Sequence, residues 1–160
     1  MARDKVPGTP AIRLLKQHKV KFIPRFYNYT EKGGTAASAK ELETSEYQII
    51  KTLVMEDDQQ LPFIVLMHGS CEVSRKHLAR QLSLKQVVPC SEEKANRLTG
   101  YQVGGISPFG TRQRMPIYME ETIAGLDTIL VNGGKRGMLV EINPLDLQRV
   151  LEPTQVSVAN

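Results

Sequence analysis

Two glycine-rich segments and one lysine carry the residue types in this chain that could hold a small polar group. Residues 104–110 read Gly-Gly-Ile-Ser-Pro-Phe-Gly, and residues 133–137 read Gly-Gly-Lys-Arg-Gly. Three glycines and a proline in the first segment cannot continue a helix or a regular strand. We therefore expect a shaped loop whose backbone amides can approach another molecule closely. The second segment has the same character with positive charge added, and we predict that both loops meet Lys51 at one site.

Lys51 lies in residues 47–55, a stretch rich in β-branched and large apolar side chains that predicts a strand. Alternation along a strand places Lys51 in one row with Ile49, Leu53 and Met55. The long lysine stem could carry its ammonium group to water beside that row. Alternatively, the cation could stand at a pocket mouth for a carboxylate, a phosphate or a developing oxyanion.

Other chemical constellations are incomplete. His68, Cys71, His77 and Cys90 are ligand-type residues, but no second paired motif completes a tetrahedral metal site. Cys71 and His77 are six residues apart in or near one expected helix, which places them on different parts of its surface. Nucleophile-elbow, Walker and dinucleotide-binding motifs are missing from the sequence. We therefore predict neither a metal nor a cofactor.

Composition sets the broad class. A chain of 160 residues fits one domain over 1–160 that buries a single core. Two cysteines without an apolar leader indicate a reducing compartment, and no apolar run approaches the roughly 20 residues that cross a bilayer. We expect a soluble, cytoplasmic protein that does not enter a membrane. The net charge of +4 is compatible with a polyanionic partner but does not require one.

Helical and strand patterns alternate too irregularly for a βαβ series. We therefore expect an α+β fold, with a small mixed β-barrel or curved sheet flanked by helices. Thr9, Thr35, Ser91 and Asn143 are the expected helix caps, and residues 153–160 are expected to be loosely held. The expected helices cover about 10–18, 35–42, 73–82, a segment from 91 and 143–151; the expected strands cover 21–29, 47–55, 61–67, 87–88, 115–119, 128–131 and 138–142.

The loop at residues 104–110 has two interpretations. Glycine there could serve only the backbone geometry of a barrel corner. Alternatively, its amides and the nearby Arg112 and Arg114 could hold phosphate oxygens, while Tyr101 and Phe109 offer ring faces to unpaired bases. The two aromatic residues could equally belong to the core.

An ordered set of motifs resembles the YbaK family. It consists of Thr9-Pro10-Ala11, Lys51-Thr52-Leu53, Gly104-Gly105-Ile106-Ser107-Pro108 and Gly133-Gly134-Lys135-Arg136-Gly137. The similarity runs from about residue 9 to residue 151. YbaK proteins are free-standing Cys-tRNA(Pro) deacylases, and they are related to the editing domain inserted in bacterial prolyl-tRNA synthetases.

The resemblance implies hydrolytic removal of a mischarged amino acid from aminoacyl-tRNA, most often cysteine from tRNA(Pro), with prolyl-tRNA synthetase as a further partner. An aminoacyl ester is already activated, so positioning it and stabilising charge on its carbonyl can suffice without an enzyme nucleophile. Catalytic roles then fall to Lys51, Gly104 and Gly105. The residues expected to bind substrate are Tyr27, Thr52, Ile106, Ser107, Asn132, Gly133, Gly134, Lys135 and Arg136.

Three positions depart from the family pattern. Asn132 replaces the serine of cysteine-specific members, Gly34 falls where they have a phenylalanine lining the pocket, and Leu139 replaces a polar residue of some relatives. A missing ring should enlarge or reshape the pocket, which bears on the choice of amino acid. The alternative function is a non-catalytic module on the same fold that binds a tRNA end, an oligonucleotide or a protein.

Overall fold

Local capping signals fix the start of several helices in the computed structural model, which describes residues 5–160. The side chains of Thr9, Ser91 and Asn143 accept hydrogen bonds from Ile12 N, Lys94 N and Leu145 N, at 3.1, 3.1 and 2.9 Å. Each bond satisfies a backbone N–H that has no partner inside its helix. These three caps confirm the sequence predictions. The helices are α1 (Pro10–Gln17), α2 (Gly34–Leu42), α3 (Arg75–Gln81), α4 (Glu92–Thr99) and α5 (Pro144–Leu151), with 3₁₀ turns η1 (Glu46–Gln48) and η2 (Glu121–Gly125).

The predicted cap at Thr35 is wrong. Helix α2 starts one residue earlier, after Gly33, and no side chain caps it. The Thr35 hydroxyl instead lies 2.7 Å from Glu46 Oε2 and 3.2 Å from the Gly69 carbonyl. These partners are distant in sequence, so a tertiary contact displaces the local capping bond.

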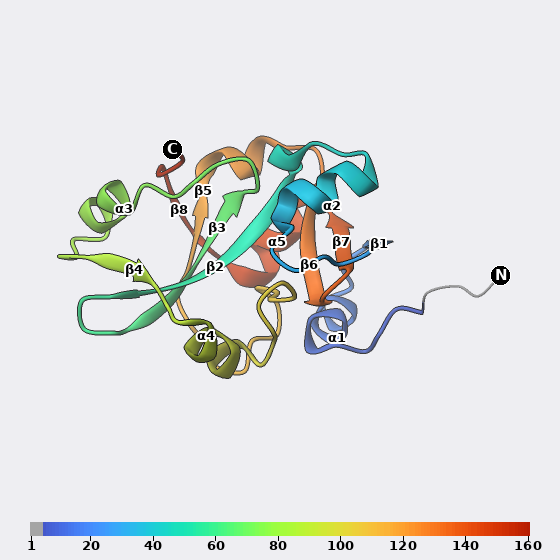
Figure 1. Ribbon diagram of the computed structural model, residues 1–160, viewed down its shortest axis with the longest axis horizontal. Coiled ribbons are helices and arrows are strands. Elements are labelled where there is room, and N and C mark those ends of the chain that lie inside the picture. Colours follow the sequence, from blue (N-terminus) through green and yellow to red (C-terminus); the bar gives the residue numbers. More distant parts are fainter. Residues whose placement is uncertain (1–4) are drawn as a thin grey trace.

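The strands form one mixed sheet, as Figure 1 shows, and its order is β1-β7-β6-β2-β3-β5-β8 with β4 paired to β2. β2 pairs antiparallel with β3 and parallel with β6, so both pairing senses occur in the sheet. Within residues 5–160, no pairing joins β1 to β8, so the α+β fold has the curved open sheet rather than a closed barrel. The strands are β1 (Ile23–Phe26), β2 (Ile49–Asp57), β3 (Pro62–His68), β4 (Val87–Pro89), β5 (Ile117–Glu120), β6 (Ile129–Lys135), β7 (Met138–Ile142) and β8 (Thr154–Val156).

Strand β2 is the centre of the sheet, and one of its edges is interrupted. Its first edge pairs with β3 from Ile50 to Glu56. The other edge pairs with β6 only at Ile49 and Ile50, and with β4 only from Met55 onward. Between these contacts, the described residues offer no strand partner to this edge, which leaves a gap in the sheet.

Helices cover both faces of the sheet. One face carries the main core, to which α1, α4 and α5 contribute Ile12, Leu98 and Leu147. The opposite face carries two smaller clusters, one under α3 and one under α2. The predicted alternation along β2 is confirmed, because Ile50 and Val54 enter the main core while Met55 enters the cluster under α3.

The prediction that residues 153–160 are loosely held is wrong. Strand β8 pairs with β5, and the Val156 and Val158 side chains are 5% and 1% exposed. The buried Glu120 carboxylate accepts hydrogen bonds from the amides of Val158 and Ala159 at 2.6 and 3.0 Å. The partners of this segment lie far upstream, so its own residue types do not reveal them.

Candidate active site

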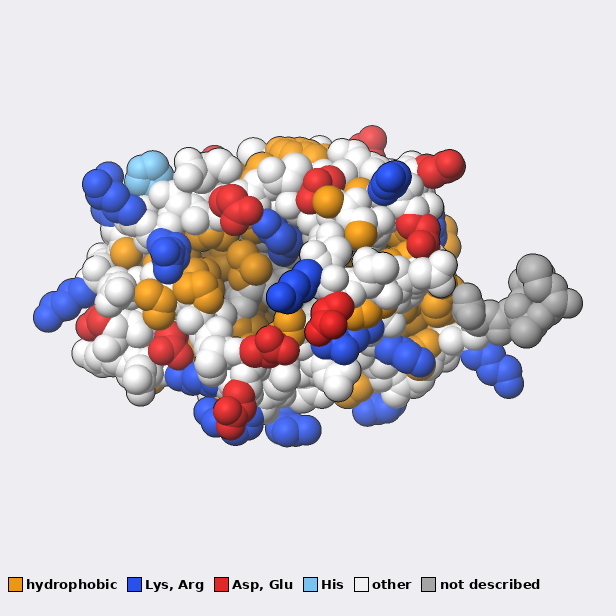
Figure 2. Space-filling model, in the orientation of Figure 1, with side chains coloured by type: hydrophobic (Ala, Val, Ile, Leu, Met, Phe, Trp, Pro, Cys, Tyr) orange, Lys and Arg blue, Asp and Glu red, His pale blue; other side chains and the backbone are white. Residues whose placement is uncertain are grey.

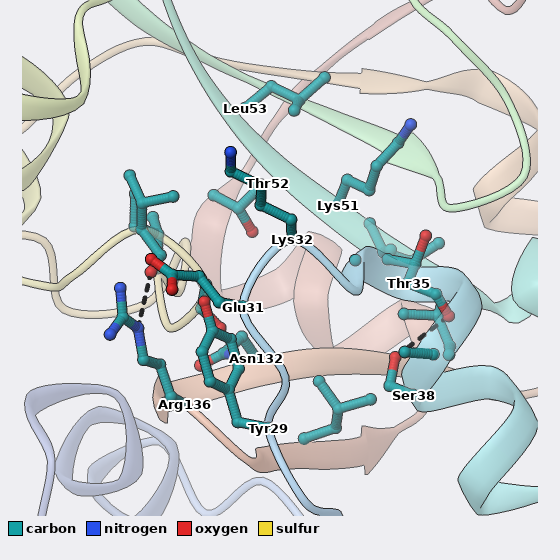
Figure 3. Close-up of a pocket in the computed structure, with 18 of the residues that line it drawn as sticks. Tyr29, Glu31, Lys32, Thr35, Ser38, Lys51, Thr52, Leu53, Asn132 and Arg136 are labelled. Carbon is teal, nitrogen blue, oxygen red and sulfur yellow. Dashed lines mark hydrogen bonds between the residues drawn. The ribbon is translucent and has the colours of Figure 1, made fainter.

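A cavity of about 540 Å³ opens beside the gap in β2. It is lined by residues of β2, of α2 and of the loop at residues 104–110, together with Asn132 of β6 and Arg136, which follows that strand. Figure 2 shows a hollow on this face of the molecule, where hydrophobic side chains lie deep and charged side chains border the rim. In Figure 3, Lys51 and Thr52 come from β2, while Asn132 and Arg136 lie across the pocket from Lys51.

Lys51 stands at the rim of this cavity and is largely buried. Its side chain is 20% exposed, and its Nζ donates a hydrogen bond to the Cys71 carbonyl at 2.6 Å. The carboxylate of Glu72 lies 3.9 Å from the same ammonium group. Since Lys51 and Gly104 both line the cavity, the structure joins them through one hollow, as the sequence predicted. The ammonium group is bonded at a backbone carbonyl rather than left free in water.

Thr52 lines the cavity and carries a polar atom without a partner in the described part of the chain. Its Oγ1 is buried, and no hydrogen-bond partner for it occurs among residues 5–160. A buried hydroxyl without a partner costs about 1–3 kcal/mol, so a ligand group that reaches this hydroxyl through a side-chain rotation would relieve the cost. The carbonyl of Val54 accepts from Cys90 N at 3.0 Å across this edge of β2, and alternation turns the backbone polar groups of Thr52 to the same edge.

The two glycine-rich loops meet, and Asn132 joins them. Its Oδ1 accepts hydrogen bonds from the amides of Gly134 and Lys135 at 2.7 and 3.1 Å. Its Nδ2 donates to the Gly104 carbonyl at 3.2 Å. A Cβ added at Gly105 would lie 2.7 Å from Arg136 N, so glycine there permits the close approach of the two backbones.

Gly104 and Gly105 differ in what their amides can do. Gly104 has φ +92°, and an added Cβ would lie 2.6 Å from the Tyr29 hydroxyl oxygen. No acceptor for the Gly104 N–H is found within the described chain. The Gly105 N–H, by contrast, donates to the Gln102 carbonyl at 2.7 Å. The expected pair of free amides is therefore reduced to that of Gly104.

Seven of the twelve predicted site residues line the cavity, and five do not. Ser107 is fully buried, and its Oγ accepts from Phe109 N at 3.2 Å, which makes it part of a turn. Residues 133–135 belong to the end of β6 rather than to a free loop, with an irregular register against β7. The residues at the cavity are Tyr27, Lys51, Thr52, Gly104, Ile106, Asn132 and Arg136, whereas Gly105, Ser107, Gly133, Gly134 and Lys135 lie outside its lining.

Tyr101 and Phe109 are core residues and do not present faces to a ligand. They are 5% and 0% exposed, and the Tyr101 hydroxyl donates to the Phe109 carbonyl at 2.6 Å. Burial raises the pKa of Tyr101 to about 12. Of the two interpretations of these rings, the structure supports packing.

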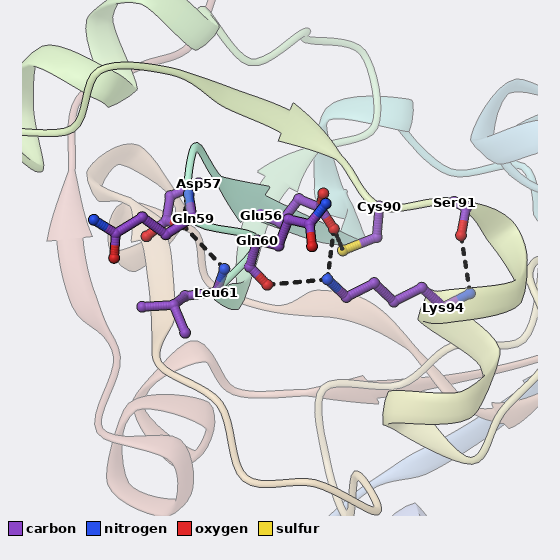
Figure 4. A network of polar contacts seen from close by, with 8 residues as sticks. All are labelled: Glu56, Asp57, Gln59, Gln60, Leu61, Cys90, Ser91 and Lys94. Atoms are coloured by element: carbon purple, nitrogen blue, oxygen red, sulfur yellow. Dashed lines mark hydrogen bonds and ion pairs between the residues drawn. The ribbon is translucent and has the colours of Figure 1, made fainter.

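A polar network borders the cavity at Cys90, as Figure 4 shows. The Cys90 thiol donates to Glu56 Oε1 at 3.4 Å, and Lys94 Nζ lies 2.7 Å from the same oxygen. The hydrogen bond from Lys94 lowers the pKa of Glu56. Burial, followed by the bond to Glu56, raises the pKa of Cys90 to about 11. The thiol is therefore neutral at physiological pH and is not activated as a nucleophile.

Sequence reasoning missed two further residues of the site. Tyr29 packs over Gly104, and the Arg136 guanidinium carbon lies 4.8 Å from its ring centroid. Cys90 reaches the cavity through the pairing of β4 with β2. The residues around Tyr29 in the sequence do not reveal its contacts with Gly104 and Arg136, because both of these residues are distant in sequence.

No cluster of three His, Cys, Asp or Glu side chains suited to a metal ion occurs within residues 5–160. The same part of the chain contains no helix long and apolar enough to span a membrane.

Comparisons with known proteins show the family of the chain. The family model of the aminoacyl-tRNA editing domain matches residues 31–150. EbsC of Enterococcus faecalis, named as a proposed Cys-tRNA(Pro)/Cys-tRNA(Cys) deacylase, is 33% identical over 90% of this chain and 89% of its own. The proline–tRNA ligase of Moorella thermoacetica is 31% identical over 72% of this chain but only 19% of the ligase.

Solved structures share the fold. The hypothetical protein APE2540 superposes with a TM-score of 0.85 at 20% identity, over 94% of this chain and 99% of the other. A proposed trans-editing enzyme for prolyl-tRNA synthetase superposes with a TM-score of 0.81 at 19% identity, over 97% and 99% of the two chains. At these identities, the superpositions establish the architecture alone.

Proposed function

The chain belongs to the family of aminoacyl-tRNA editing domains and is an aminoacyl-tRNA deacylase, and on this premise we propose that it removes cysteine from mischarged tRNA(Pro). The observation that carries the proposal is one hollow lined by Lys51, Gly104 and Thr52, whose buried hydroxyl has no partner within residues 5–160. The name of EbsC supports cysteine as the amino acid and tRNA(Pro) as a carrier. The similarity to part of proline–tRNA ligases supports a free-standing role that accompanies prolyl-tRNA synthetase.

Gly104, Thr52 and Lys51 have different roles in binding the substrate and in stabilising charge on its ester. The Gly104 amide stabilises negative charge on the ester carbonyl oxygen as the tetrahedral intermediate forms. The Thr52 hydroxyl bonds a polar group of the aminoacyl moiety, which satisfies an otherwise unpaired atom. Lys51 has a flexible side chain, so its ammonium can turn from the Cys71 carbonyl toward the terminal ribose or phosphate.

Cleavage needs no nucleophile from the protein, which agrees with the neutral Cys90 thiol. With cysteine, the substrate sulfur attacks its own ester carbonyl, the ester C–O bond breaks and the ribose hydroxyl leaves with a proton. The resulting thiolactone is then hydrolysed by water. With an amino acid that lacks a nucleophilic side chain, a water molecule must add to the carbonyl directly. Correct placement of the reacting atoms supplies the rate in both routes.

The test is loss of amino acid from tRNA(Pro) charged with cysteine, alanine or proline. We expect the fastest hydrolysis with cysteine and none with proline. Hydrolysis of the alanyl ester at the same rate as the cysteinyl ester would refute the substrate-assisted route, because alanine has no thiol.

A Lys51→Ala variant tests the site itself. We expect a loss of about 100-fold or more in kcat/KM, similar to the removal of one charge-stabilising group. Circular dichroism should show an unchanged fold, since Lys51 is at the rim of the cavity and its substitution removes no volume from the hydrophobic core. Lys51→Arg is the matched variant that keeps the charge and should retain part of the activity. Wild-type activity in Lys51→Ala would refute the assigned role.

A further inference from the structure

A second hollow of about 570 Å³ adjoins the cavity described above, and its lining differs in chemistry. Tyr27, Tyr29 and Arg136 line both hollows, so these side chains form a shared wall. The second hollow extends along the β6–β7 turn, where it adds Lys135 and Gly137, and reaches Lys5 near the described start of the chain.

Positive charge dominates this second hollow. The lining contains three cationic side chains and one carboxylate, that of Glu41. The cations are Lys5, Lys135 and Arg136. Glu41 Oε2 already accepts a hydrogen bond from Asn28 N at 2.6 Å, which commits part of its charge. Within residues 5–160, none of the three cations forms an ion pair with a carboxylate. Three solvent-accessible cations that lack acidic partners favour an anionic ligand.

Aromatic rings accompany these cations. Phe26, Tyr27 and Tyr29 line the second hollow and are half-buried. Arg136 lies over the Tyr29 ring, and its Nε donates to the Val103 carbonyl at 2.9 Å, which holds the guanidinium group in place. Cations that alternate with ring faces are the pattern that binds single-stranded nucleic acid, where the cations contact phosphates and the rings stack on bases.

We infer that this second hollow binds the phosphodiester backbone of the single-stranded 3′ end of tRNA, upstream of the esterified nucleotide. The inference rests on the proposed function, because the ester must first occupy the main cavity. If the last nucleotide of the tRNA lies in that cavity, the preceding nucleotides must leave it across one part of its rim. Glu31 and Glu92 line the main cavity and would repel phosphate there, whereas the second hollow has one carboxylate, Glu41, and is lined by Lys5, Lys135 and Arg136.

Lys135 is the residue for the test, since its exposed side chain lines the second hollow but not the main cavity. Only its backbone amide takes part in the Asn132 bridge, so Lys135→Ala and Lys135→Glu should fold normally. Lys76→Ala and Lys76→Glu are matched controls, because Lys76 is exposed on α3, which lies at the left of Figure 1, away from β6 and β7.

Binding is measured by fluorescence anisotropy with a hexaribonucleotide that ends in CCA and carries no amino acid, at several salt concentrations. We expect Lys135→Ala to weaken binding and to reduce the slope of log affinity against log salt by about 0.7, the value for one lost phosphate contact on a single strand. Lys135→Glu should weaken binding further, and the Lys76 variants should match the wild type. Equal affinity and slope in wild-type and Lys135 variants would overturn the inference.

Deacylation kinetics separate this inference from the proposed function. Lys135→Ala should raise KM for charged tRNA while kcat stays constant, and it should leave hydrolysis of an aminoacyl-adenosine, which has no upstream phosphate, unchanged. An equal loss on both substrates would overturn the inference while deacylation stands. If the wild type hydrolyses neither substrate but binds the oligonucleotide through Lys135, the proposed function fails and the phosphate site remains.

Discussion

The side-chain amide of Asn132, in β6, donates a hydrogen bond to the backbone carbonyl of Gly104 at 3.2 Å, which ties this strand to a loop 28 residues away in sequence. The Asn132 oxygen accepts from Gly134 N and Lys135 N, so one side chain sets the geometry of both glycine-rich segments. The bond from Asn132 fixes the peptide group between Gly104 and Gly105, whose N–H donates to the Gln102 carbonyl. The Gly104 N–H lies in the preceding peptide group, so Asn132 acts on it through the backbone of Gly104.

Substitution of Asn132 should show this dependence. Asn132→Ala removes all three bonds, and we expect a loss of about 1–3 kcal/mol in unfolding free energy together with a large fall in kcat. Asn132→Asp keeps an acceptor for the two amides but places a negative oxygen against the Gly104 carbonyl. Urea denaturation and deacylation assays should therefore show a smaller loss of stability in Asn132→Asp and a comparable loss of kcat. Wild-type kcat in Asn132→Asp would mean that the bond to Gly104 does not matter for catalysis.

Gly104→Ala should damage the site through backbone geometry and contact. The residue has φ +92°, and the new Cβ would meet the Tyr29 ring at 2.6–2.9 Å. Strain of this kind costs about 1–3 kcal/mol, and a displaced loop should lower kcat more than it raises KM. Gly125→Ala is the control, because an added Cβ there meets no atom within 4 Å and its φ is not left-handed. Equal effects of the two substitutions on kcat would contradict the role of Gly104.

The pH dependence of Cys90 alkylation tests the thiol environment. In a Cys71→Ser variant, Cys90 is the single thiol, and burial has raised its pKa from 9.0 to about 11. A raised pKa means that thiolate appears only at higher pH, so at pH 8 its fraction should be about 100-fold below that of the unfolded chain. Iodoacetamide alkylation should accelerate up to about pH 11 in the folded protein, but should level near pH 9 in urea.

Glu56→Gln provides the second arm of this experiment. The substitution removes the carboxylate that accepts from the thiol, so the midpoint of the alkylation profile should move to lower pH. Limited access of the reagent would slow alkylation equally at every pH and would leave the midpoint unchanged. Identical midpoints in the folded and unfolded protein would refute the raised pKa.

Glu120 should be essential for the C-terminal strand. Its side chain is 2% exposed, and its carboxylate accepts from the amides of Val158 and Ala159. Glu120→Ala would leave two amides unsatisfied, and we expect a loss of about 1–3 kcal/mol in urea unfolding. Glu120→Gln keeps an acceptor oxygen and should lose less. Hydrogen exchange should accelerate in residues 154–159 of Glu120→Ala, and unchanged protection there would contradict this assignment.

The segment after β8 contacts the chain that holds Lys51, which gives this prediction a functional consequence. Asn160 and Glu72 exchange backbone hydrogen bonds at 2.9 and 3.2 Å. Cys71, which precedes Glu72, holds the Lys51 ammonium through its carbonyl. Loosening the C-terminal strand should therefore also disturb the resting position of Lys51, and Glu120→Ala should lower kcat/KM more than Glu120→Gln.

The sequence by itself determined the elements whose cause is local. Thr9, Ser91 and Asn143 cap helices because each side chain bonds an amide two or three residues ahead. The alternation around Lys51 predicted the strand and the two faces that β2 presents, since side chains on a strand alternate regardless of their partners. The ordered glycine-rich motifs also led to the family and to the joint presence of Lys51 and Gly104 at one hollow.

Only the tertiary structure decided which atoms of the site are available. The amide of Gly105 is occupied by the Gln102 carbonyl, and the Lys51 ammonium is held by the Cys71 carbonyl. The Thr52 hydroxyl is buried without a partner within residues 5–160. The C-terminal strand and the Thr35 contact were likewise missed. Each depends on the pairing of distant segments, where hydrogen-bond partners are chosen by the packing of the whole sheet and leave no trace in the neighbouring residues.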